Sequence, residues 1–188
     1  TYETAIKYFT LADEYAPLYR RTEFQKRWAK IQRLVCSPLL ESGTKEFMIK
    51  EILLNLDEAT DYLKTIVWAR LFRYYISVSD FPNAIKYARL AIVVGEESGI
   101  MVIPTIAYGI LAKFAITMEE HAEAVRLTSR YLQLCSENGV YDCFRMHKAY
   151  GPILEFALNN GIEPDFTKQM LALAGYNPKK LYIRTLGG

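Results

Sequence analysis

The sequence predicts an all-α fold, an α-solenoid of antiparallel helix pairs with about nine helices and a short extended tail. Three observations support this. Apolar residues recur at helical spacing, a helix pattern returns about every forty residues, and turn-forming residues separate the segments. Hydrophobic residues make up 51% of the 188 residues, which is enough for an extended core.

The helix pattern begins at the first residues. A helix is predicted at 2–16, because Ala5, Phe9 and Ala12 share one face and Pro17 ends the pattern. Similar faces follow at Ile49 and Ile52, at Ala84, Ala88 and Ala91, and at Ala124, Thr128 and Tyr131. The anchor positions 5, 45, 84 and 124 are 39 or 40 residues apart, and a helix at 164–173 continues the series. A fixed spacing of this size indicates a solenoid, in which small residues let neighbouring helix backbones approach closely.

Partner helices are predicted between these segments, at 18–36, 57–79, 102–117 and 140–159. Ser42-Gly43, Asn138-Gly139 and Asn160-Gly161 mark turns between elements. The result is four hairpins preceded by one unpaired helix. Because the segment 181–186 has strand character and no partner strand, we expect a repeat domain at 1–177, then a linker and the first strand of a further domain at 178–188. We therefore expect the chain to be part of a longer protein.

Two segments resemble known families. Tyr2 to Pro17 resembles the second helix of a tetratricopeptide repeat, and Ser79 to Glu97 is similar, with Ala88 in place of the usual aromatic residue. The interval of 40 residues departs from the usual length of about 34 residues in that family. It resembles the superhelical domain of MalT-like, ATP-dependent bacterial transcription regulators. The segment from Leu181 to Gly188 is similar to the opening strand of the winged-helix module in bacterial activators of the antibiotic-regulatory type.

These resemblances imply a right-handed superhelix inside a multidomain bacterial transcription regulator. They imply a nucleotide-binding domain upstream, where ATP would bind, and a DNA-binding domain downstream. This segment itself would be a cytoplasmic regulatory domain without a cofactor. It would bind a protein or small-molecule effector and would dock on other domains of the same protein.

The candidate site is the concave groove, which the first helix of each stacked pair lines. Arg33, Arg73 and Lys113 form a basic column at intervals of 40, and Lys30 and Arg70 lie one turn earlier. Ser77 extends the polar stripe, and three tyrosines fall on the same helices, at Tyr108, Tyr141 and Tyr150. Such a groove suits an acidic peptide, a phosphate group or an acidic domain. The alternatives are a solvated face with local ion pairs and, for the aromatic residues, packing between repeats.

Several other functions are disfavoured. The 23 Lys and Arg nearly balance 21 Asp and Glu, which argues against a broad nucleic-acid surface. The chain lacks a Ser-His-Asp order, a Gly-rich phosphate loop and clustered carboxylates, so we expect no enzyme. Metal binding is not expected either, because His121 and His147 lack ligand partners at helical spacing. The apolar run at 100–118 contains Pro104 and Lys113 and keeps step with the repeats, so no membrane span is expected.

Three cysteines, Cys36, Cys135 and Cys143, are odd in number and widely spaced, which favours buried free thiols. Two further hypotheses for the whole chain stay open. One is a stand-alone tetratricopeptide-type adaptor that binds an acidic peptide. The other is homodimerisation through exposed apolar faces at the end of the array.

Overall fold

The structure is a computed structural model that describes residues 4, 7, 8, 10, 11, 42–54, 56–139 and 150–174. Within these residues every regular element is a helix, so the all-α prediction is confirmed for them. The chain divides into two compact units, Thr1–Ser98 and Gly99–Gly188. The predicted helix at 18–36, most of the predicted helix at 2–16 and the predicted strand at 181–186 lie outside the described residues.

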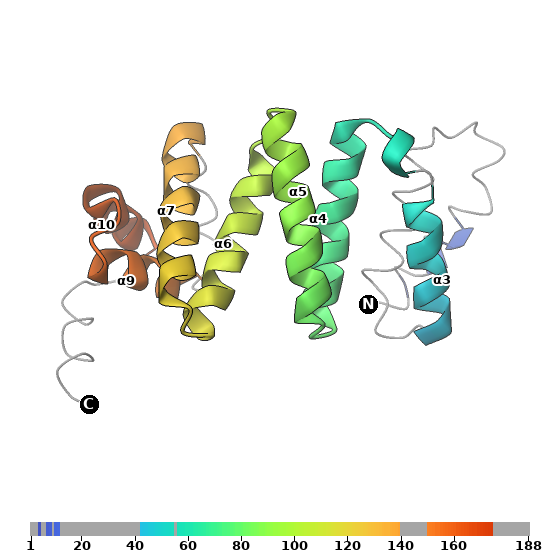
Figure 1. The fold of residues 1–188 in the computed structure, drawn as a ribbon, viewed down its shortest axis with the longest axis horizontal. Helices are drawn as coiled ribbons and strands as arrows, with labels where there is room; N and C mark the ends of the chain where they lie inside the picture. The colour runs from blue at the N-terminus through green and yellow to red at the C-terminus, as the bar shows by residue number, and fades with distance from the viewer. Residues whose placement is uncertain are drawn as a thin grey trace. The chain divides into compact units, whose positions relative to one another are not determined.

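The first unit contains α3 (Ser42–Leu53), a short 3-10 helix η3 (Leu56–Glu58), α4 (Asp61–Ser77) and α5 (Phe81–Glu97). The helices α4 and α5 pack against each other along their length as an antiparallel hairpin (Figure 1). The buried residues of α4 recur at helical spacing, among them Leu63, Val67 and Leu71.

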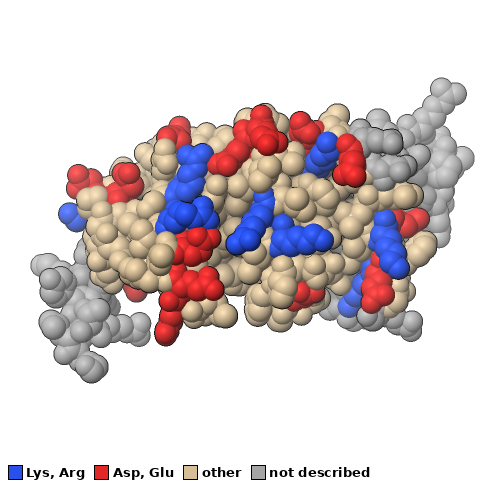
Figure 2. All heavy atoms as spheres, in the orientation of Figure 1, with Lys and Arg blue, Asp and Glu red and all other residues tan. Residues whose placement is uncertain are grey.

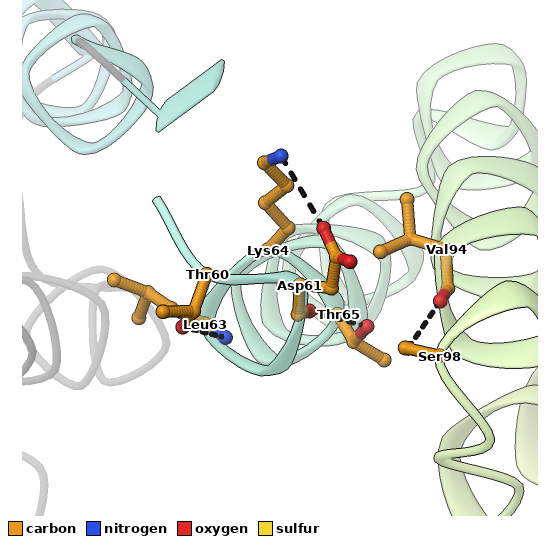
Figure 3. A network of polar contacts seen from close by, with 7 residues as sticks. All are labelled: Thr60, Asp61, Leu63, Lys64, Thr65, Val94 and Ser98. Carbon is orange, nitrogen blue, oxygen red and sulfur yellow. Dashed lines mark hydrogen bonds and ion pairs between the residues drawn. The ribbon is translucent and has the colours of Figure 1, made fainter. Parts of the chain in front are cut away.

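The start of α4 differs from the prediction, which placed a helix from residue 57. Thr60 caps α4 instead, because its Oγ1 atom accepts a hydrogen bond from the Leu63 amide at 3.4 Å. Asp61 in the first turn pairs with Lys64 at 3.4 Å, and the Thr65 hydroxyl donates to the Asp61 carbonyl at 2.7 Å (Figure 3). The acidic residue suits the positive end of the helix dipole. Residues 56–58 therefore form a separate turn rather than the first turn of α4.

The second unit contains α6 (Val102–Thr117), α7 (His121–Asn138), α9 (Gly151–Asn159) and α10 (Pro164–Leu173). The predicted ranges 102–117 and 164–173 agree with α6 and α10. The pairs α6–α7 and α9–α10 each pack together, and α9 also contacts both α6 and α7. Within this unit the second helix pair therefore lies against the first (Figure 1).

The same turn joins the two helices of each pair. Ser79, Glu119 and Gly161 occupy its left-handed position, with φ of 60°, 58° and 66°. In each turn the amide of the next residue donates to a carbonyl five residues back: Asp80 to Tyr75, Glu120 to Ala115, and Ile162 to Ala157. This is the Schellman arrangement that ends a helix and satisfies its last carbonyls. The left-handed positions are 40 and then 42 residues apart, so the first interval equals the one seen in the sequence and the second is two residues longer.

The small-residue anchors occupy the same position in each helix pair, close to the start of its second helix. The amides of Ala84, Ala124 and Thr167 donate to the carbonyl of the residue that caps their helix, at 3.0, 2.8 and 2.8 Å. All three side chains are buried. The predicted anchors Ala84 and Ala124 are therefore confirmed as core positions, whereas Ala5 lies outside the described residues.

One close approach inside the α6–α7 pair depends on glycine. A Cβ atom added at Gly109 would lie 2.8 Å from Cε2 of Tyr131, whose side chain is 1% exposed. The Tyr131 ring also stacks on Tyr150 at a centroid distance of 5.9 Å, so it has little room to move. Forty residues earlier the corresponding pair is Ala69 and Ala91. The large ring at 131 is thus accommodated by the smallest residue at 109.

We expect opposite effects from two substitutions in the repeated turn. Glu119→Gly should raise the free energy of unfolding by up to about 1 kcal/mol, because glycine adopts the left-handed conformation without steric cost. Gly161→Ala should lower it by about 1 kcal/mol, since an added Cβ there meets no atom within 4 Å and only the backbone is strained. Urea unfolding of the full chain measures both. Glu119→Gln controls for the lost charge. A stabilising effect of Gly161→Ala would contradict the left-handed conformation assigned to residue 161.

Gly109→Ala should destabilise the second unit by about 1–3 kcal/mol, because the added methyl group overpacks against the Tyr131 ring. In a Tyr131→Ala background the same change should stabilise by about 1 kcal/mol, since alanine is the better helix former. A double-mutant cycle in urea measures the coupling. Equal effects of Gly109→Ala in both backgrounds would show that the ring does not require glycine.

Candidate functional site

The candidate site begins with a stripe along α4. Arg73 and Ser77 are exposed there, and Arg70 is half-buried one turn earlier. Tyr62, 56% exposed, and Ile66 continue the same face toward the start of the helix. The buried residues of α4 occupy another face. The α4 stripe therefore has apolar residues in its first half and basic or hydroxyl groups in its second half.

A matching stripe follows α6 at positions 40 residues later. Val102 and Ile106 are 56% and 37% exposed in its first half, and Ile110 takes the place of Arg70. Lys113 and Thr117 are exposed in its second half. Both hydroxyl groups bond within their helix: Ser77 donates to the Tyr74 carbonyl at 2.6 Å, and Thr117 donates to the Lys113 carbonyl at 2.9 Å. The two helices thus present the same order of apolar and basic groups.

Arg70 differs from the other cations of these stripes. Burial is the larger cause that lowers the pKa of the Arg70 guanidinium below its usual value, and the neighbouring positive charge of Arg73 lowers it further. Two positive charges this close, one of them partly withdrawn from water, repel each other. An anion next to both groups would relieve that repulsion, which makes the second half of the α4 stripe the more strongly anion-attracting part.

The remaining predicted residues are placed differently. Lys30, Arg33 and Tyr141 lie outside the described residues. Tyr108 is only 8% exposed, so little of its ring reaches solvent. Tyr150 precedes the first turn of α9 and stacks on the Tyr131 ring. The burial of Tyr108 and the stacking of Tyr150 favour the packing alternative for these two tyrosines.

An aromatic stack joins α4 and α5. The Tyr87 ring lies between Trp68, at a centroid distance of 5.6 Å, and Tyr75, at 5.3 Å with nearly parallel planes. Tyr74 meets the edge of Tyr75 at 5.1 Å. Trp68 therefore makes a contact inside the hairpin.

Burial shifts the titration of these phenols. Burial, and then the adjoining phenols of Tyr87 and Tyr74, raise the pKa of Tyr75 to about 12. Burial also raises the pKa of Tyr87, although a hydrogen bond from Tyr75 acts in the opposite direction. Because the ionised phenolate would lose its hydration here, the folded hairpin holds these hydroxyl groups in the protonated form.

Sequence reasoning missed a second surface, on the outer side of α5. Pro82, Ile85, Lys86, Arg89, Leu90 and Val93 line an open hollow of about 460 Å³ there. These residues recur at three- and four-residue spacing, which is a usable signal. The assignment of the inner face to Ala84, Ala88 and Ala91 left the apolar residues Ile85, Leu90 and Val93 unexplained.

Among the described residues, no cluster of three or more His, Cys, Asp or Glu side chains could hold a metal ion. No helix in these residues has both the length and the apolar character needed to cross a membrane. Cys135 is a buried free thiol, as predicted, and Cys36 and Cys143 lie outside the described residues.

Comparisons with protein-family models, with curated proteins and with solved structures found no match to this chain. By its fold, the described part of the chain is a protein built from helical hairpins. The resemblance to tetratricopeptide repeats and to MalT-like regulators stays a prediction from the sequence.

We expect the free energy of unfolding to fall between pH 10 and pH 12. An unfolded tyrosine loses its proton near pH 10, whereas folded Tyr75 keeps its proton up to about pH 12. The contribution of protonated Tyr75 to the free energy of unfolding is complete below pH 10 and is lost as the pH rises through its folded pKa of about 12. Urea unfolding at several pH values should show a shallower loss for Tyr75→Phe. Equal slopes for Tyr75→Phe and the unaltered chain would contradict the assignment.

Proposed function

We propose that this chain is a binding domain in which the stripe on α4 and the stripe on α6 each offer a contact surface to a protein or small-molecule effector. The observation that carries the proposal is the repeated order of exposed groups along the two helices. Apolar side chains at Tyr62 and Val102 are followed by cations at Arg73 and Lys113. A solvated face has no need to keep several apolar residues exposed, and apolar surface bordered by charge is typical of interaction sites.

The arrangement suits a ligand with both apolar and negatively charged groups. Guanidinium and ammonium groups pair with carboxylates or phosphates through charge-assisted hydrogen bonds. The exposed apolar residues of both stripes would contribute by burying surface on binding.

The sequence resemblance suggests where such a domain works. In a MalT-like regulator, an effector bound to the repeat domain would change how that domain docks on its neighbours, and DNA would be bound by another domain. This regulatory context is part of the proposal, supported by the 40-residue interval and by the backbone turn that recurs with it. The second candidate is an adaptor that binds an acidic peptide through the same stripes, without a DNA-binding domain. The gene sequence downstream of Gly188 distinguishes them, since a winged-helix pattern there would favour the regulator.

Binding can be tested with a labelled 12-residue peptide that is rich in Glu and Leu and carries Pro at every third position. The prolines keep the peptide from forming a helix. We expect micromolar affinity by fluorescence anisotropy and at least tenfold weaker binding by the double variant Arg73→Glu with Lys113→Glu. Both side chains are exposed, so the fold should persist.

The matched control is the double variant Lys86→Glu with Arg89→Glu on α5, which lowers the net charge by the same amount. It should bind the proline-containing peptide as the unaltered chain does. Equal weakening by both double variants would indicate attraction by net charge only. Undiminished binding by the Arg73 and Lys113 variant would rule out the stripes as the site.

A further inference from the structure

The outer face of α5 is an apolar surface with two cations in it. The hollow described above lies on the side of α5 opposite to Ala84, Ala88 and Ala91, which are buried. Val93 is 51% exposed, Pro82 is exposed, and Ile85 and Leu90 are half-buried. The residues from 82 to 93 extend over about 16 Å along the helix, at 1.5 Å per residue. Figure 2 shows Lys and Arg side chains over the middle of this helix.

The two cations in this hollow lack acidic neighbours. No Asp or Glu stands three or four residues from Lys86 or Arg89 along α5, and the two cations are themselves three residues apart. Neither forms an ion pair with any residue that the structure describes. The Lys86 ammonium lies 5.4 Å from the centre of the Tyr87 ring, which is a weak, partly exposed contact. Like charges at this helical spacing destabilise the helix slightly.

The corresponding face of α7, forty residues later, is an ordinary solvated surface. Arg126 takes the place of Lys86 there, and its Nε and one terminal nitrogen each donate to Glu123 at 2.7 Å. Gln133 takes the place of Val93 and donates to Glu137 at 2.7 Å. Ser129 and Arg130 replace Arg89 and Leu90. The apolar hollow, whose cations have no ion pair among the described residues, is therefore absent from the corresponding face of α7 and is not imposed by the repeated hairpin.

We propose that this surface binds an acidic amphipathic helix of a partner protein. Apolar side chains of the partner would cover Ile85, Leu90 and Val93, and its carboxylates would pair with Lys86 and Arg89. A helix of about three turns matches the length of the hollow and presents apolar residues at the same spacing. Removing the apolar face from water supplies the attraction, and the two cations set the orientation and exclude basic partners.

A second copy of this chain fits the surface less well. In a twofold symmetric dimer the same patch faces itself, so Lys86 and Arg89 of each copy would approach the same cations of the other. Four positive charges would then meet at an apolar interface. An acidic partner removes this repulsion and satisfies both cations, so charge complementarity selects it.

The test uses the full chain and a stapled 14-residue helical peptide with Leu at positions 3, 7, 10 and 14 and Glu at the flanking positions. We expect a Kd in the micromolar range by isothermal titration calorimetry. Binding should weaken at least tenfold for Lys86→Glu with Arg89→Glu and for Val93→Asp. A peptide with Lys in place of every Glu should not bind.

The variant Arg73→Glu with Lys113→Glu should bind the stapled helix as the unaltered chain does. Because the two surfaces are on different helices, this proposal and the proposed function can fail independently. Loss of binding in the Arg73 and Lys113 variant alone would place the helix on the stripes and overturn the inference. So would the absence of binding at millimolar peptide, or dimerisation in sedimentation that Val93→Asp abolishes, which would identify a second copy as the occupant.

Discussion

Each hairpin depends on a backbone constraint at its turn, where one residue adopts the left-handed conformation and closes the first helix. The carbonyls freed at the end of the first helix are satisfied within the turn. The residue that caps the second helix follows directly after the left-handed residue in the α4–α5 and α6–α7 pairs and one residue later in the α9–α10 pair. The two helices are thereby held antiparallel at a fixed register. Ala84 and Ala124 then fall at the same place in the contact between the helices, and this register determines which residues face outward.

The α4–α5 and α6–α7 pairs share the same backbone turn but carry different side chains at corresponding positions. Gly109 lies against Tyr131 in the second hairpin, and the positions 40 residues earlier hold Ala69 and Ala91. The large ring then reaches Tyr150 before α9, so that it connects the hairpin to the following pair. In the first hairpin the aromatic side chains lie at other positions, in the stack of Trp68, Tyr87 and Tyr75. Similar turns are therefore compatible with different cores.

Much of the helix pattern could be predicted from the sequence, because apolar spacing and turn residues act locally. The range of α10 follows from Pro164 at its start, and the buried faces of α5 and α7 follow from Ala84 and Ala124. The start of α4 could not be predicted by periodicity alone, since residues 57–60 fit a helix pattern until Thr60 is seen to cap it. The exposure of Arg73 and Lys113 agrees with the predicted column, but the burial of Tyr108 depends on contacts distant in the sequence.

The contrast between α5 and α7 shows that similar helices can carry different outer faces. Both bury one face through small residues, which leaves the opposite face free of any folding requirement. On α7 this free face carries Glu123 and Arg126 in a paired, hydrated arrangement that gives little stability. On α5 it carries Ile85 and Val93 beside two cations that form no ion pair with the residues the structure describes, an arrangement that folding does not require and that exposes apolar surface to water. This surface does not stabilise the fold, and its exposure to water costs free energy. A partner that covers it is the simplest explanation.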